Sequence, residues 1–421
     1  MSRLSIHFFV FAIVSFALGL AAAPWLVVEA VDFFYQPHLL ALVHTFTLGW
    51  ITPTIMGVMY RFAPALTKRP LRFERLALVQ LGLYLIGVIG MVAHFAVGSW
   101  PGNWSSSALV VVSGVLFAVN LLPGLASGFE RGVAEAGMFL SVVFFIAAAT
   151  LGFLFALDKS VDLFGGSLIP NLGAHAALAG CGWITLTICA LSYRFVPAFL
   201  LPKVLPAPHV RRQLYGIAFG ATGLAATLIV STGGAIIWSG IIVVALLAYA
   251  ISLGRIVRSR QMPIDWTIRH ALAGLGWLVI AAVIGLVLAS VGAGSEAGSR
   301  FAAVYGIVGL FGWASNLIIG FSYQLFPAFV LRARAVDAPP MTIADVSLAR
   351  LRLWVFFAFN AGIVLLVFGF AAGQEWLVRL GATLLATGGL PYAAATLWTL
   401  SHAYRRSTPQ TGEGSLRIVP S

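Results

Sequence analysis

Charged residues are scarce in this chain. Only 9% of its 421 residues are charged, whereas 60% are hydrophobic and the mean hydropathy is +0.99. A soluble domain cannot carry so apolar a surface, so the composition excludes a soluble protein and predicts an all-α integral membrane protein. The net charge of +12 is expected to lie in loops facing the cytoplasm, so the partner is membrane lipid and not nucleic acid.

Acidic residues and cysteines are also few. The chain has 13 Asp and Glu residues, and those near the apolar segments fall close to segment ends, which argues against a proton pump because a pump relays protons through intramembrane carboxylates. The two cysteines, Cys181 and Cys189, lie in one apolar run. Their placement favours packing residues over a disulfide or a metal pair.

Long apolar runs are plentiful, and each is near or above the length that a helix needs to cross a bilayer. The runs predict twelve transmembrane helices, at about residues 6–28, 39–66, 76–97, 108–126, 137–157, 171–200, 214–230, 234–253, 268–290, 301–330, 353–371 and 376–402. Lys and Arg concentrate in alternate loops, which predicts that both termini lie on the cytoplasmic side. The membrane is expected to be the bacterial inner (cytoplasmic) membrane. We expect one membrane domain over residues 1–406 and a polar cytoplasmic tail over residues 407–421.

One sequence frame occurs three times. It has a Gly-Trp pair, a Tyr ten residues after the Trp and a Pro four residues further on, in the copies that start at Gly49-Trp50, Gly182-Trp183 and Gly312-Trp313. The copies fall on the second, sixth and tenth predicted helices, so the chain is expected to be three units of four helices, about residues 1–130, 131–260 and 261–406. The Gly before each Trp predicts close helix approach. Pro53 predicts a bend in the first copy.

Histidines are the candidate metal or haem ligands. His44, His94 and His175 are expected at matched depth within the outer half of the membrane, with His38 as a fourth candidate. An ionisable residue is costly there, and a neutral imidazole is the usual protein ligand of haem iron or copper. The alternative for each one is a hydrogen-bonded core histidine. The other four, at positions 7, 209, 270 and 402, are expected to be solvated at the cytoplasmic side.

The twelve helices, the threefold repetition and the spacing from His to Gly-Trp and Tyr-Pro resemble subunit I of the haem-copper oxidase superfamily. The resemblance is greatest to the branch of nitric oxide reductases and cytochrome c oxidases with b-type haem. It implies that His44 is a low-spin haem ligand and that His175 is a ligand of the active-site metal. It further implies haem b as cofactor, with copper as a second candidate, and other respiratory subunits or a c-type cytochrome as partners. The resemblance also makes Arg379 a candidate partner of haem propionates, and the alternative is an arginine that extends its side chain to the membrane surface.

Several ligands of that family are missing here. The seventh helix, within residues 213–256, has no histidine, and the tenth reads Val304-Tyr305-Gly306-Ile307 where the family has His-x-His. An ion that has lost these ligands cannot be held in the same geometry, so the binuclear centre is expected to be incomplete. A local string from Asp265 to Trp277 is similar to the family's helix 10 motif, but it lies on the ninth helix.

Two functions stay open at this point. One is a haem-binding protein of respiratory electron transfer or of nitric oxide and oxygen response, and, if it is an enzyme, a cytochrome c oxidase- or nitric oxide reductase-like oxidoreductase. In that case His44, or the pair His94 and His175, is expected to bind the iron. The other is a haem- or copper-handling transporter or assembly factor that uses the same scaffold without catalysis.

Overall fold

The computed structural model describes residues 2–100, 102–130, 132–164, 168–206, 208–231, 233–333, 341–342 and 349–404. Within these ranges it has twelve helical stretches that are long and apolar enough to cross a membrane, as the sequence predicts. The expected tail over residues 407–421 lies outside the described residues, and the boundaries of the three units stay predictions. The α-helices are α1 (Ser2–Leu26), α2 (Pro37–His44), α3 (Thr52–Thr67), α4 (Glu74–Ala96), α5 (Asn103–Gly128), α6 (Val133–Val161), α7 (Leu168–Ala176), α8 (Leu186–Leu200), α9 (Arg211–Val230), α10 (Ala235–Arg258), α11 (Trp266–Val291), α12 (Glu296–Ile307), α13 (Asn316–Ala333), α14 (Arg352–Ala372) and α15 (Glu375–Ser401).

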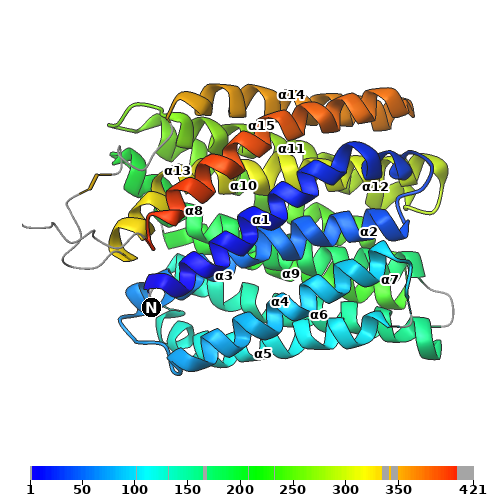
Figure 1. Ribbon diagram of the computed structural model, residues 1–421, viewed down its shortest axis with the longest axis horizontal. Helices are drawn as coiled ribbons and strands as arrows, with labels where there is room; N and C mark the ends of the chain where they lie inside the picture. The colour runs from blue at the N-terminus through cyan, green and yellow to red at the C-terminus, as the bar shows by residue number, and fades with distance from the viewer. Residues whose placement is uncertain are drawn as a thin grey trace, which may run out of the picture.

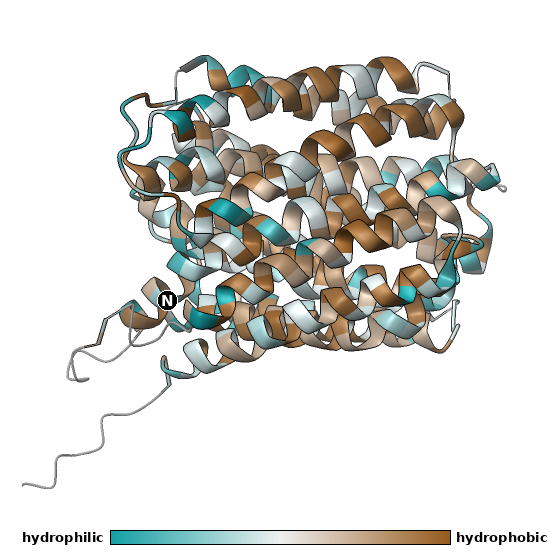
Figure 2. Cartoon of the chain, turned by 90° about the horizontal axis from the view of Figure 1, so that it is seen from above, coloured by the Kyte–Doolittle hydropathy of each residue, from teal (hydrophilic) through white to brown (hydrophobic). Residues whose placement is uncertain are grey.

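The helices run side by side along the long axis of the molecule (Figure 1). Helix α1 begins at one end, here called the N-terminal end, and α2, α7 and α12 begin at the opposite end, here called the far end. Hydrophilic residues gather at the two ends and apolar residues between them (Figure 2), as a bilayer requires of a bundle whose backbone groups are satisfied within its helices.

The three copies of the frame share an irregular backbone. In each, an α-helix passes through a π-helical segment that contains the Gly-Trp pair and then continues as an α-helix. These π-helices are η2 (Thr45–Ile51), η3 (Ala177–Thr185) and η5 (Val308–Ser315). The position of Pro53 is Leu186 in the second copy and Asn316 in the third. The irregular turn is therefore a property of the frame and does not depend on the proline.

Close helix approach at the Gly of each frame is confirmed. A Cβ added to Gly49 would lie 2.8 Å from the Ser15 Cβ on α1, and one added to Gly182 would lie 2.3 Å from the Phe144 ring on α6. At Gly312 the neighbour is the Trp277 ring on α11, at 2.7 Å. Each frame is thus packed against the helix that opens its own repeat, and only glycine fits there.

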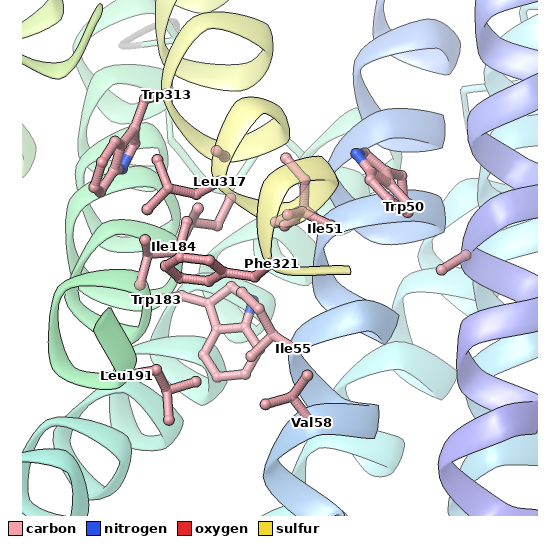
Figure 3. Close-up of a cluster of buried hydrophobic side chains, with 14 of the residues drawn as sticks. Trp50, Ile51, Ile55, Val58, Trp183, Ile184, Leu191, Trp313, Leu317 and Phe321 are labelled. Carbon is pink, nitrogen blue, oxygen red and sulfur yellow. The ribbon is translucent and has the colours of Figure 1, made fainter. Parts of the chain in front are cut away.

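The three tryptophans of the frame join the repeats in a ring (Figure 3). The indole Nε1 of Trp50 donates to Ser315 Oγ at 3.1 Å, and Trp183 Nε1 donates to Thr52 Oγ1 at 3.0 Å. Trp313 Nε1 donates to Thr185 Oγ1 at 3.2 Å, which closes the ring. Every acceptor is the hydroxyl two residues after the Trp of another repeat. All six residues are buried, so the ring supplies buried partners for three polar groups at the centre of the bundle.

Below the ring, toward the N-terminal end, the axis is apolar. Helices α3, α8 and α13 line a cavity of about 50 Å³ with side chains that include Ile55, Leu191 and Phe321. These side chains point toward one another around the axis in Figure 3. An apolar cavity of this size does not favour water.

Candidate functional site

His44 lies at the end of α2, immediately before the π-helix η2. Its Nδ1 is 2.7 Å from the Leu40 carbonyl oxygen, one turn earlier, and its ring lies 5.0 Å from the Phe95 ring on α4. A carbonyl only accepts, so the Nδ1 carries the proton and donates it, and the Nε2 keeps its lone pair. A metal-binding histidine is oriented by this kind of second hydrogen bond.

His175 lies near the end of α7 in the second repeat, eight residues before Trp183, whereas His44 lies six residues before Trp50. Its ring packs beside Gly152 and lies 5.9 Å from the Phe155 ring on α6. The Nδ1 is buried and has no hydrogen-bond partner. A buried polar atom without a partner is costly, so it marks a position where a ligand would be stabilised.

His44 and His175 lie within electrostatic range of each other, with His44 against α4 and His175 against α6. The two imidazoles interact electrostatically, although 131 residues separate them and they belong to different repeats. In the part of the chain that the structure describes, no three His, Cys, Asp or Glu side chains converge as a metal site.

The other two predicted histidine ligands lie elsewhere. His94 is half-buried at the end of α4, with its ring against the backbone of Gly102. The His38 Nδ1 is 3.0 Å from a Glu29 carboxylate oxygen near the surface. Arg379, predicted to bind haem propionates, is exposed on the first turns of α15.

The third repeat carries Tyr305 where the first two carry histidine. Its hydroxyl lies 4.0 Å from Cys181 Sγ, and its ring packs beside Gly285 on α11. Cys181 is six residues after His175 and is buried. The contact between Tyr305 and Cys181 joins the second and third repeats. In the sequence, Tyr305 becomes a candidate only when the three copies of the frame are aligned.

The space between the second and tenth spans is filled with aromatic side chains. Phe46, two residues after His44, faces the Phe311 ring of η5 at 4.6 Å, while His44 faces α4. Phe16 stacks on Trp50 at 4.5 Å and contacts the Phe359 ring at 6.3 Å. All five rings are buried. A haem held by His44 toward the tenth span does not fit, because the histidine points away from that span and the space it would need is packed.

Two of the histidines expected at the solvated surface are buried instead. His270 is 0% exposed and its Nδ1 lies 2.9 Å from Asn316 Oδ1, and His402 is 3% exposed with its Nδ1 2.8 Å from the Trp398 carbonyl oxygen. The expectation was wrong because position along a span does not say which helix face is covered. His7 and His209 are exposed, as expected.

The surface above His44 is closed by an aromatic cluster. Tyr35 stacks on Trp100 at 5.8 Å, and the Lys159 ammonium lies 5.5 Å and 5.3 Å from their centroids. Trp100 in turn lies 5.7 Å from Phe95, which contacts His44. Burial and the negative charge of Asp158 raise the pKa of Tyr35 to about 12, so its hydroxyl stays protonated at neutral pH. The cluster joins the first and second repeats over the histidine pair.

No protein-family model matches the sequence, and no curated protein does either. The chain is similar in structure to a haem-copper terminal oxidase that was solved as a dimer by cryo-electron microscopy. The TM-score is 0.65 at 14% sequence identity, over 96% of this chain and 85% of the other. At this identity the likeness concerns the fold alone. The twelve-helix bundle of this chain, with its threefold ring of tryptophans, therefore has the fold of a haem-copper oxidase, as the sequence frame predicts.

Proposed function

We propose that this chain is a non-catalytic membrane protein of oxidase-like fold that handles copper, with one Cu(I) ion bound between His44 and His175. The proposal rests on two imidazoles from different repeats that lie within electrostatic range of each other, His44 with its Nδ1 held by the Leu40 carbonyl and His175 with an unpaired Nδ1. Imidazole suits copper, and Cu(I), a d¹⁰ ion, accepts two nitrogen ligands in a linear arrangement.

The residues around the pair favour a small ion over a haem. The aromatic packing between the second and tenth spans leaves no place for the family's low-spin haem, and Tyr305 stands where the family's tenth helix supplies histidine. When bound, copper would supply a transferable cation. His44 and His175 would hold it, the Leu40 carbonyl would orient His44, and the cluster of Tyr35, Trp100 and Lys159 would limit its exchange with the far side.

The cellular role follows from the fold and from this chemistry. We infer a multi-pass protein of the bacterial inner membrane with both termini in the cytoplasm. In that membrane it would deliver copper to a respiratory oxidase or withdraw copper from it. Other subunits of such a complex are the proposed partners, because the neighbour of like fold is a terminal oxidase.

The test is metal content. The full-length protein, purified from copper-supplemented cells and kept reduced, is expected to hold a single copper ion per chain, with only nitrogen scatterers in its copper X-ray absorption spectrum. His44→Ala and His175→Ala are each expected to lose the ion, because one imidazole is a poor site by itself. His38→Ala and His209→Ala, whose side chains lie elsewhere, are the matched controls and are expected to keep it.

The same preparation distinguishes the haem alternative. A Soret band that disappears in His44→Ala or His175→Ala would show haem bound by these residues and would contradict the copper proposal. A copper content unchanged in both alanine variants would contradict it as well.

A further inference from the structure

The third repeat breaks the symmetry of the frame at its tyrosine. In the first repeat Tyr60 donates to Gln80 Oε1 at 3.2 Å, and in the second Tyr193 donates to Gln213, twenty residues on in both cases. The residue twenty positions after Tyr323 is an isoleucine in the sequence. The Tyr323 hydroxyl is buried and has no hydrogen-bond partner.

His270 on α11 lies beside the Tyr323 ring. Its ring lies 5.7 Å from the Tyr323 ring, and its Nδ1 lies 2.9 Å from Asn316 Oδ1. The Asn316 amide nitrogen donates to the Gly312 carbonyl at 2.9 Å, so the oxygen of that amide is the atom that faces the imidazole. The His270 Nδ1 therefore carries the proton, and its Nε2 presents a lone pair. That Nε2 is buried without a partner, and the whole side chain is 0% exposed.

A third unpaired atom lies on the same face of α11. Thr267, one turn before His270, is fully buried and its Oγ1 has no partner. Leaving a buried polar atom dry costs about 1–3 kcal/mol. Three such atoms on one interface, where α11 and α13 meet at Gly320, indicate an internal ligand with hydrogen-bonding capacity.

A cavity at the N-terminal end borders Tyr323, the one of these three residues that lines it. It lies between α13, α14 and α15 and is lined by polar side chains that include Tyr323, Thr396 and Arg352. Its volume of about 40 Å³ is enough for a few water molecules and too small for an organic ligand. The Arg352 guanidinium lies 4.8 Å from the centre of the Tyr323 ring and is half-buried, so the cavity reaches the surface end of the bundle.

We propose that internal water occupies the space between Tyr323, Thr267 and His270 Nε2 and connects this histidine to solvent at the N-terminal end. Water donates to the Nε2 lone pair and accepts from the Tyr323 and Thr267 hydroxyl groups, so each of the three buried groups is satisfied. The site belongs to the third repeat alone, because the position of Asn316 is Pro53 in the first and Leu186 in the second. It is independent of the copper proposal, since His44 and His175 lie toward the far end.

The groups that face His270 are mostly uncharged. Asn316 and Tyr323 on α13 and Phe356 on α14 surround the ring. The nearby charges are Arg352 on α14 and, on α11 itself, Asp265, whose carboxylate caps the helix and accepts from Gln324. Water is thus the ligand that the surroundings favour, rather than a metal ion or an anion.

Deuterium exchange at the imidazole Cε1–H tests the proposal, because exchange of this hydrogen requires contact with water. The full chain in lipid nanodiscs is exposed to D₂O, and each histidine is followed by mass spectrometry. His270 is expected to exchange several-fold faster than His175, which also has an unpaired nitrogen but lies toward the far end, whereas His270 packs against Tyr323 at the edge of the cavity. Ala395→Leu fills the cavity and is expected to slow His270, whereas Ala394→Leu, on the exposed face of α15, is the matched control.

Two results overturn the proposal. Exchange at His270 as slow as that at His175 shows a dry site. Fast exchange that Ala395→Leu does not slow shows that water does not arrive through this cavity. The His175 comparison in the same sample separates either result from a general loss of folding.

Discussion

The ring of tryptophans makes a quantitative prediction about how the first and third repeats are joined. Trp50 and Ser315 are 265 residues apart, and their hydrogen bond of 3.1 Å closes the ring between the two ends of the membrane domain. Ser315→Ala removes one oxygen and leaves the buried Trp50 indole N–H without an acceptor. Trp50→Phe removes the donor and part of a ring that stacks on Phe16.

The magnitude follows from burial. Interhelical hydrogen bonds within membranes contribute about 0.6 kcal/mol on average and up to about 1.7 kcal/mol. Trp50 is 0% exposed and Ser315 is 1% exposed, so the upper part of that range applies and Ser315→Ala is expected to cost about 1–2 kcal/mol. Trp50→Phe is expected to cost about 2–4 kcal/mol, because packing is lost in addition.

The assay is a double-mutant cycle on the free energy of unfolding in mixed detergent micelles. The coupling between the two substitutions is expected to be about 1 kcal/mol, and Ser401→Ala, an exposed serine that donates to its own helix, should change stability by less than about 0.5 kcal/mol. A coupling indistinguishable from zero would refute the view that the ring holds the repeats together. The corresponding pair of Trp313 and Thr185 is expected to give a similar value, since the ring repeats the same contact.

Two further substitutions test the packing, and each has a matched control variant. Gly182→Ala is expected to lower the free energy of unfolding by about 1–3 kcal/mol, because its Cβ would lie 2.3 Å from the Phe144 ring. Gly180→Ala, with nothing within 4 Å, is expected to leave stability unchanged or raise it by up to about 1 kcal/mol; a loss as large as that of Gly182→Ala would contradict the packing argument. Asn360→Ala is expected to cost about 1–3 kcal/mol in the same unfolding assay, because Trp277 Nε1 loses its acceptor at 3.0 Å, while the exposed Thr383→Ala should be nearly neutral. Equal stability of the Asn360 and Thr383 variants would show that the buried amide network contributes nothing.

Much of the scaffold was predictable because lipid imposes simple rules. Every span must be long and apolar, so hydropathy alone located the twelve helices, including the short seventh span that the structure shows as α9. The close approach at Gly49, Gly182 and Gly312 was predictable for a similar reason, since a Gly beside a buried Trp has few other uses. The threefold repeat was visible because the frame keeps its spacing.

The sequence predicted which histidines are candidate site residues, but it did not predict which groups surround each of them. Sequence position placed His44, His94, His175 and His38 on the same side of the membrane, yet only the fold shows that His44 packs against α4 and His175 against α6, while His38 pairs with Glu29. Direction around the helix decides this. Phe46, two residues after His44, faces the tenth span, whereas His44 faces α4. The sequence of one helix does not state which neighbouring helix each of its faces contacts.

The sequence by itself determined that the chain is a twelve-helix membrane protein built from three related units, because hydrophobicity and spacing are properties of residue order. The tertiary structure alone decided what the repeats do to one another. The ring of Trp50, Trp183 and Trp313 and the buried His270 with its unpaired neighbours each depend on side chains from helices far apart in the chain. The physical reason is that a buried polar group in a membrane must find its partner across a helix interface, and helix packing, not residue order, sets which partner that is.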